Sequence, residues 1–160
     1  MPADDAARAI QPCCGSREWA ARLAARRPIS SEAALFAAAD EVWRALNRHD
    51  WIEAFNSHPR IGESRAALKS HPHSAAWSSQ EQSGAANNAN EVKLALAQGN
   101  LEYERRFGRI FIVCATGKDA AEMLEILRRR LQNDPETELL EAAEQQRQIT
   151  RIRLKKWMAE

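Results

Sequence analysis

The spacing of apolar side chains along the chain predicts a protein built from α-helices. Apolar residues recur every three or four positions, which is the period of a helix with one buried face. This pattern covers five stretches, residues 17–27, 31–47, 79–107, 120–132 and 135–157. Two shorter helices are expected after Asp50 and around residues 65–69. The pattern therefore indicates an all-α fold, a helical bundle of about seven helices.

Polar residues at the expected helix starts support this division. Side chains that can cap a helix N-terminus stand at Ser16, Ser31 (or Ser30), Asp50 and Asp119. Asp134 precedes Pro135, and proline is favoured at the first position of a helix. Ser78 followed by Glu81 three residues later has the form of a capping box.

One run of residues departs from the helical pattern. Residues 109–114 read RIFIVC, a short apolar run rich in β-branched and aromatic side chains. A single strand has no partner, so we expect a buried, extended segment near 109–116 instead of a sheet. Backbone N–H and C=O groups in such a segment lack helical partners, and they bind either a ligand or other protein groups.

Composition and charge limit the possible classes of function. The chain has 160 residues, of which 44% are hydrophobic and 28% charged, as expected for one globular domain spanning 1–160. Its formal net charge of +1 gives no drive toward nucleic acid or membranes. No apolar run approaches the roughly 18 residues of a membrane-spanning helix. The N-terminus does not resemble a signal peptide, and the final residues are not an SKL-type signal, so we expect a cytoplasmic protein without nucleic-acid or membrane partners.

The three cysteines do not form a recognisable disulfide or metal framework. Cys13 and Cys14 are adjacent, and Cys114 lies far away in the apolar run. We expect reduced thiols, with Cys114 buried.

Two short motifs contain the candidate catalytic side chains. His58 stands between a predicted helix and the turn-forming Pro59, with a side chain suited to proton transfer near neutral pH. Considered alone, the position favours an ordinary turn histidine over a catalytic one. The N-terminus at Ser78 offers N–H groups and a positive dipole to an anionic or carbonyl-rich ligand, and Glu81 can accept hydrogen bonds from ureido N–H groups.

The order of three motifs resembles the 2-oxo-4-hydroxy-4-carboxy-5-ureidoimidazoline (OHCU) decarboxylases of urate degradation. The motifs are His58-Pro59-Arg60-Ile61-Gly62, then Ser78-x-x-Glu81-Gln82, then a Tyr103-to-Gly117 stretch that includes Phe107-Gly108 and Phe111-Ile112-x-Cys114-Ala115. The likeness extends over nearly the whole chain, and it is the combination of motifs that makes it specific.

The resemblance implies an all-helical, usually dimeric enzyme that converts OHCU to (S)-allantoin and CO2 without a cofactor or metal. It implies that His58 is the catalytic histidine and Glu81 the catalytic or substrate-orienting carboxylate. It also implies a set of substrate-binding positions, namely Pro59, Ser78, Gln82, Ile110, Phe111, Ile112, Val113, Cys114 and a C-terminal arginine, for which Arg153 fits better than the nearby Arg151.

Two other interpretations stay open at this point. The C-terminal helix carries a basic cluster, Arg147, Arg151, Arg153, Lys155 and Lys156, which suits a non-enzymatic helical interaction module with an acidic partner. His58, His71 and His73 could instead serve a metal-dependent hydrolase.

Overall fold

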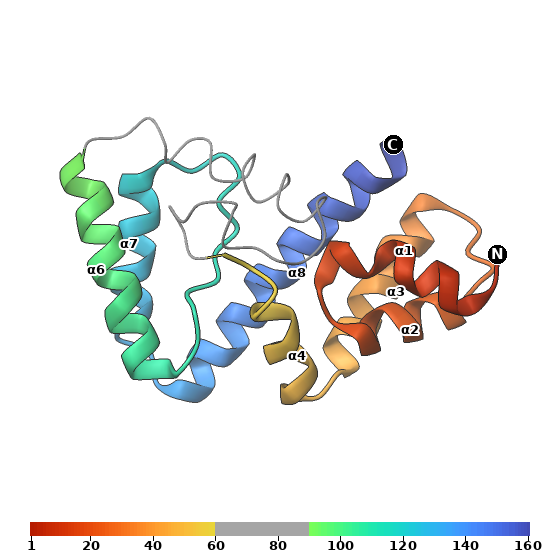
Figure 1. Ribbon diagram of the computed structural model, residues 1–160, viewed down its shortest axis with the longest axis horizontal. Helices are drawn as coiled ribbons and strands as arrows, with labels where there is room; N and C mark the ends of the chain where they lie inside the picture. Colours follow the sequence, from red (N-terminus) through yellow and green to blue (C-terminus); the bar gives the residue numbers. More distant parts are fainter. Residues whose placement is uncertain (60–89) are drawn as a thin grey trace. The chain divides into compact units, whose positions relative to one another are not determined.

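A computed structural model describes residues 1–59 and 90–160 of the protein (Figure 1). Over these two ranges it contains seven α-helices and no β-strand, which confirms the predicted all-α fold. None of these helices is long and apolar enough to cross a membrane. The helix predicted around 65–69 and the capping box at Ser78 lie outside the described residues.

The chain divides into two compact units. The terminal unit comprises Met1–Ser57 together with Gln146–Glu160, and the central unit comprises His58–Gln145. The long helix α8, Pro135–Ala159, contributes its first part to the central unit and its second part to the terminal unit.

The terminal unit contains four further helices, α1 (Ala3–Cys14), α2 (Arg17–Ala25), α3 (Glu32–Ala45) and α4 (Arg48–Phe55). Helix α2 packs against α1, α3 and α4. Its Trp19 is fully buried and donates its indole N–H to the Ala39 carbonyl of α3 at 3.2 Å. In the same way, the indole of Trp51 in α4 donates to the Trp43 carbonyl of α3 at 2.9 Å. These aromatic side chains therefore fill the core and also fix the helices to one another.

Most helix starts agree with the caps expected from the sequence. The side chains of Ser16, Ser31 and Asp119 each accept a backbone N–H three residues later, as N-caps do. The prediction for Asp50 is wrong, because its own N–H donates to the side chain of Asn47 at 2.9 Å. Asn47 is the true cap, and α4 begins at Arg48, three residues earlier than expected.

Helix α1 is not predicted by the sequence pattern. Pro12 lies in its last turn, and a proline inside a helix usually interrupts it. The sequence around Pro12 therefore does not indicate a helix, although Ile10 and Cys13 are on its buried face. The helix ends at Gly15, whose φ of 93° is left-handed and suits a glycine cap. A Cβ at Gly15 would come within 2.3 Å of the Ser57 hydroxyl, so the close approach of these two segments also requires glycine.

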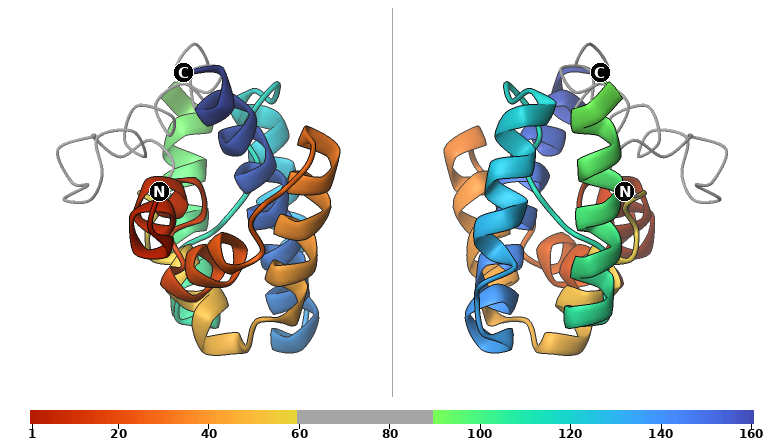
Figure 2. Two further views of the ribbon diagram at one scale, coloured as in Figure 1. Left: turned by 90° about the vertical axis from the view of Figure 1, so that its right-hand side faces the viewer. Right: turned by 90° about the vertical axis from the view of Figure 1, so that its left-hand side faces the viewer.

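The central unit is built on α6 (Asn90–Phe107), α7 (Ala120–Arg130) and the first part of α8. Helices α6 and α7 lie side by side and run in the same direction (Figures 1 and 2). The chain between them must therefore return along the helices. Helix α7 has 11 residues, a length of about 16 Å. Residues 109–115 can cover this distance only as extended chain, which rises about 3.3 Å per residue.

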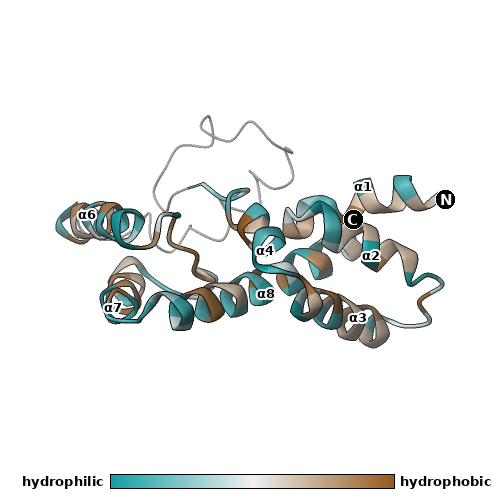
Figure 3. Cartoon of the chain, turned by 90° about the horizontal axis from the view of Figure 1, so that it is seen from below, coloured by the Kyte–Doolittle hydropathy of each residue, from teal (hydrophilic) through white to brown (hydrophobic). Residues whose placement is uncertain are grey.

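The core of the central unit forms between α6, α7 and this returning segment, which appears as a brown, hydrophobic stretch in Figure 3. Its buried members are Leu96, Tyr103, Phe111, Val113, Ala115, Ala120, Met123, Leu124 and Leu127. The segment near 109–116 is thus buried and non-helical, as the sequence predicts.

Candidate active site

His58 follows directly on the end of α4. That helix is capped by Asn56, and the Ser57 hydroxyl donates to the Ala54 carbonyl at 2.7 Å, which closes the last turn. His58 and Pro59 are both half-buried. The structure therefore places the histidine on a hydrogen-bonded turn followed by a proline, the stiff position that the sequence predicts.

The second predicted motif cannot be compared with the structure. Ser78, Glu81 and Gln82 lie outside the described residues, and so do His71 and His73. Within 1–59 and 90–160, no three His, Cys, Asp or Glu side chains are grouped as a metal site would need.

The third predicted element, Ile110–Cys114, alternates as an extended strand does. Phe111, Val113 and Ala115 contribute their side chains to the core between α6 and α7. Ile112 and Cys114 are also buried but do not belong to that cluster. Side chains of odd and even residues thus leave opposite faces of the segment, which is the period of two expected for extended backbone.

Side chains from α7 and α8 bind the backbone of this segment. The guanidinium of Arg130 donates to the Ile112 carbonyl at 2.6 Å, and the Cys114 N–H donates to the side-chain oxygen of Gln145 at 2.8 Å. Lys118 adds a contact to the Cys114 carbonyl at 2.9 Å. The sequence leaves open whether these backbone groups bind a ligand or the protein, and for these three the partner is the protein.

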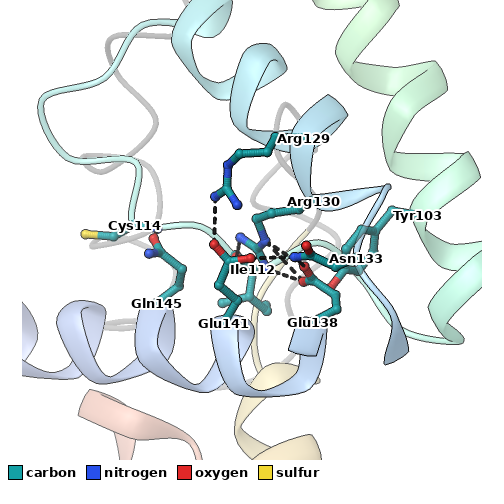
Figure 4. Close-up of polar contacts among 9 residues, drawn as sticks. All are labelled: Tyr103, Ile112, Cys114, Arg129, Arg130, Asn133, Glu138, Glu141 and Gln145. Carbon is teal, nitrogen blue, oxygen red and sulfur yellow. Dashed lines mark hydrogen bonds and ion pairs between the residues drawn. The ribbon is translucent and has the colours of Figure 1, made fainter. Parts of the chain in front are cut away.

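Arg130 is itself held by a buried carboxylate. It is 1% exposed, Glu138 is 0% exposed, and they are joined by three hydrogen bonds of 2.5, 3.0 and 3.1 Å. Glu138 also accepts from the Tyr103 hydroxyl and from Asn133, so its charge is compensated on several sides (Figure 4). The guanidinium lies 4.6 Å from the centre of the Phe111 ring.

This environment changes the ionisation of Tyr103. Burial raises the pKa of its hydroxyl, and the hydrogen bond to Glu138 adds to the effect because a second negative charge there is unfavourable. Tyr103 therefore acts only as a donor in this network.

Arg130, Glu138 and Gln145 are not predicted from the sequence motifs. A signal exists for Arg130, because Met123, Leu127 and Arg130 share one helical face and the first two are core residues. Arg130 is the last of three consecutive arginines, so its charge conceals this position. Glu138 is likewise on the buried face of α8, at helical spacing from Ala142 and Gln146.

The two C-terminal arginines differ in environment. Arg153, in the terminal unit, is 1% exposed, whereas the side chain of Arg151 is 53% exposed and lies over the Phe36 ring. Arg147 is paired with Asp40 at 3.2 Å. The basic cluster of the C-terminal helix is thus divided, with Arg153 buried, Arg147 paired, and Arg151 and Lys155 exposed.

The buried Cys13 and Cys14 lie in the same unit. Burial raises the pKa of both thiols to about 12, although the positive charge of Arg153 acts in the opposite direction. All three cysteines are free and buried, and the burial of Cys114 is as the sequence predicts.

Comparison with known proteins connects these features to one family. The model of the OHCU decarboxylase family matches residues 1–155. The chain belongs to the OHCU decarboxylase family. This confirms the resemblance on which the sequence analysis is based.

Two solved structures have the same fold. The chain is 36% identical to a protein whose crystal structure is described as OHCU decarboxylase in the presence of (S)-allantoin, with a TM-score of 0.79 over 94% of this chain and 96% of that one. A crystal structure of (S)-allantoin synthase, at 18% identity, has a TM-score of 0.71 over 98% of this chain and 50% of that one, and this likeness concerns the fold alone.

The matches to curated relatives cover only part of each relative. The chain is 36% identical, over 90% of its length, to the uric acid degradation bifunctional protein TTL of Arabidopsis thaliana, and covers 44% of that protein. It is 37% identical, over 47% of its length, to 2-oxo-4-hydroxy-4-carboxy-5-ureidoimidazoline decarboxylase of Mus musculus, and covers 42% of it. The chain therefore spans less than half the length of these curated relatives.

Proposed function

We propose that this protein decarboxylates OHCU to (S)-allantoin and CO2 in urate degradation. The observation that carries the proposal is the family match over residues 1–155, together with the fold shared with a 36% identical decarboxylase crystallised in the presence of (S)-allantoin. The reaction defines the partner as a small molecule, and a single OHCU decarboxylase domain over 1–160 is the form we expect to act.

The reaction can proceed without a cofactor. The bond between C4 of the ring and its carboxylate breaks, CO2 leaves, and the electron pair forms a C4=C5 double bond while the C5=N electrons pass to the ring nitrogen, which takes up a proton. The 4-hydroxyl of this enol then loses its proton to become the C4 carbonyl, and a proton bonds to one face of C5, the carbon that bears the ureido group. The protein must hold the carboxylate out of the ring plane, stabilise the developing charge and deliver the proton to one face.

We assign the proton delivery to His58. Its place after the hydrogen-bonded end of α4 and before Pro59 restricts the backbone that carries the imidazole. A fixed donor protonates one face only and gives (S)-allantoin, whereas spontaneous decay in water gives the racemate. Glu81 orients the substrate through its ureido or ring N–H groups.

The remaining predicted residues bind the substrate. We propose that Ser78 and Gln82, at the predicted helix N-terminus, and the adjacent Pro59 contact its polar edges. The backbone of Ile110–Cys114 offers amide groups to the ureido substituent. Arg153 binds the carboxylate in preference to Arg151, because a buried guanidinium interacts with an anion more strongly than one screened by water. We propose that the protein is a cytoplasmic homodimer, because enzymes of this family are usually dimeric.

The test is to generate OHCU from urate in situ and to follow optically active allantoin by circular dichroism. Wild type is expected to accelerate its formation, and His58→Asn to lower the rate by about 10² to 10⁴, the range of a general acid–base residue. Glu81→Ala is expected to lower activity as well. His49→Asn is the matched control, because His49 is an exposed histidine in the preceding helix.

Unchanged formation of (S)-allantoin by His58→Asn would remove that residue from proton delivery. Loss of wild-type activity after exhaustive chelation would favour the metal-dependent alternative. No turnover by wild type, combined with salt-sensitive capture of an acidic protein, would favour the interaction module.

A further inference from the structure

The segment Ile110–Cys114 is bound to the protein along one of its two edges. In extended backbone the N–H and C=O of one residue point to one edge, and those of the next residue point to the other. The groups with partners on α7 and α8 are the carbonyl of Ile112 and the N–H of Cys114, held by Arg130 and Gln145. Both belong to even-numbered residues, so they define a single edge.

The opposite edge is then fixed by geometry. The alternation of side chains over 111–115 shows that the segment is extended, with Phe111 and Val113 anchored in the core. The N–H and C=O groups of Phe111 and Val113 must therefore point away from the edge held by Arg130 and Gln145. Rotation of the segment would move Phe111 out of the core and break the bonds of Ile112 and Cys114 together.

The side chains that hold the segment are themselves restrained. Arg130 is hydrogen-bonded to Glu138, which also accepts hydrogen bonds from Tyr103 and Asn133 (Figure 4). An arginine buried only for stability is a costly choice, because desolvation offsets much of the attraction between paired charges. Its planar guanidinium, however, can bind a carboxylate and a backbone carbonyl at fixed angles.

We propose that Arg130 and Gln145 are positioning residues that hold one edge of Ile110–Cys114 so that the backbone groups of Phe111 and Val113 are presented to the ureido edge of the substrate. This inference rests on the proposed decarboxylation. It adds that the substrate is recognised by the backbone edge formed by the N–H and C=O groups of Phe111 and Val113. The side chains that set the geometry of this edge make no contact with the substrate.

The first test replaces Gln145, which is half-buried. Gln145→Leu deletes the acceptor for the Cys114 N–H, and Gln145→Glu retains an acceptor oxygen. We expect KM for OHCU to rise about tenfold in Gln145→Leu, the size of one hydrogen bond, with a smaller change in kcat. Gln145→Glu should restore most of the binding. Gln132→Leu makes the same chemical change as Gln145→Leu at an exposed position of the central unit and should leave KM unaltered.

A second measurement does not depend on activity. Amide hydrogen exchange at Cys114 should become faster in Gln145→Leu, because its N–H loses the protein acceptor, and should stay slow in Gln132→Leu. Arg130→Lys, which keeps the charge but loses the forked geometry, should raise KM as Gln145→Leu does. Arg129→Lys, at the adjacent exposed arginine, should not.

The outcomes separate this inference from the proposed function. A wild-type protein that forms no (S)-allantoin contradicts the proposed decarboxylation. An active wild type whose KM is the same in Gln145→Leu, Arg130→Lys and the two controls contradicts the positioning role and leaves the decarboxylation intact. Faster exchange at Cys114 without any change in KM also overturns it, because the segment would then be loosened without effect on substrate.

Discussion

The two units of this protein achieve stability in different ways. The terminal unit packs regular helices, and its buried tryptophans Trp19 and Trp43 lie in a core with alanine and leucine neighbours. The central unit must hold a non-helical segment, whose backbone groups need partners that a helix would supply internally. Arg130 and Gln145 supply two of these partners, and Glu138 compensates the buried guanidinium. An irregular segment in a core thus requires polar side chains where a helix requires apolar ones.

The largest expected effect comes from breaking the buried ion pair of the central unit. Arg130→Met leaves Glu138 charged and buried, and we expect the free energy of unfolding to fall by about 3–5 kcal/mol. Arg129→Met breaks the neighbouring exposed pair with Glu141 and should cost less than about 1 kcal/mol. Urea unfolding of both variants measures the difference.

A double variant distinguishes charge from packing in this comparison. Arg130→Met combined with Glu138→Leu removes both charges and should recover much of the lost stability. Equal losses for Arg129→Met and Arg130→Met would contradict the role of the buried pair.

A smaller effect is expected at a glycine of the terminal unit. Gly15 and Gly117 have similar positive φ values, 93° and 78°. A Cβ added at Gly15 would clash with Ser57, whereas a Cβ added at Gly117 would have no other atom within 4 Å. Gly117→Ala should therefore cost about 1–2 kcal/mol for the left-handed backbone alone. Gly15→Ala should cost about 2–4 kcal/mol, because the steric clash adds to this strain. Thermal and urea unfolding of the pair would show whether close packing is as important in the terminal unit as we infer.

The smallest effect concerns the buried thiols and appears only at alkaline pH. Burial raises the pKa of Cys13 and Cys14 from 9.0 to about 12. The unfolded thiols ionise first, so the stability they contribute is complete below pH 9 and is lost as the pH rises from 9 to 12. By pH 10 the loss should be about 1 kcal/mol for each thiol.

A variant isolates this contribution from the central unit. Cys13→Ala/Cys14→Ala should lose less stability than wild type between pH 8 and pH 10, as measured by urea unfolding. Tyr103, whose pKa is also raised, is present in both proteins and cancels in the comparison. Identical pH profiles would mean that the two thiols are accessible to water.

Local chemistry made much of the fold predictable. The caps at Ser16, Ser31 and Asp119 are confirmed because an N-cap depends only on its own helix turn. Asp50 is not the cap because α4 already begins at Arg48, so Asp50 lies within the helix and its own N–H is bound by Asn47 three residues earlier. Helix α1 escaped prediction because it contains Pro12, which locally indicates a helix break.

The candidate site could be predicted only in part. His58, Pro59 and the segment Ile110–Cys114 follow from motifs, and the predicted roles of Ser78, Glu81 and Gln82 remain predictions. Helical spacing puts Arg130 on the face of Met123 and Leu127, but its charge, in a run of three arginines, hides that it is buried while Arg129 beside it is exposed. That difference depends on Glu138 and Tyr103, which reach Arg130 from other helices.

The sequence by itself determined the helical fold and the family, because helical periodicity, caps and short motifs are properties of neighbouring residues. The tertiary structure decided which charged groups leave water and which edge of the extended segment is bound to the protein. The physical reason is that a charge can be buried only where partners from distant parts of the chain converge on it.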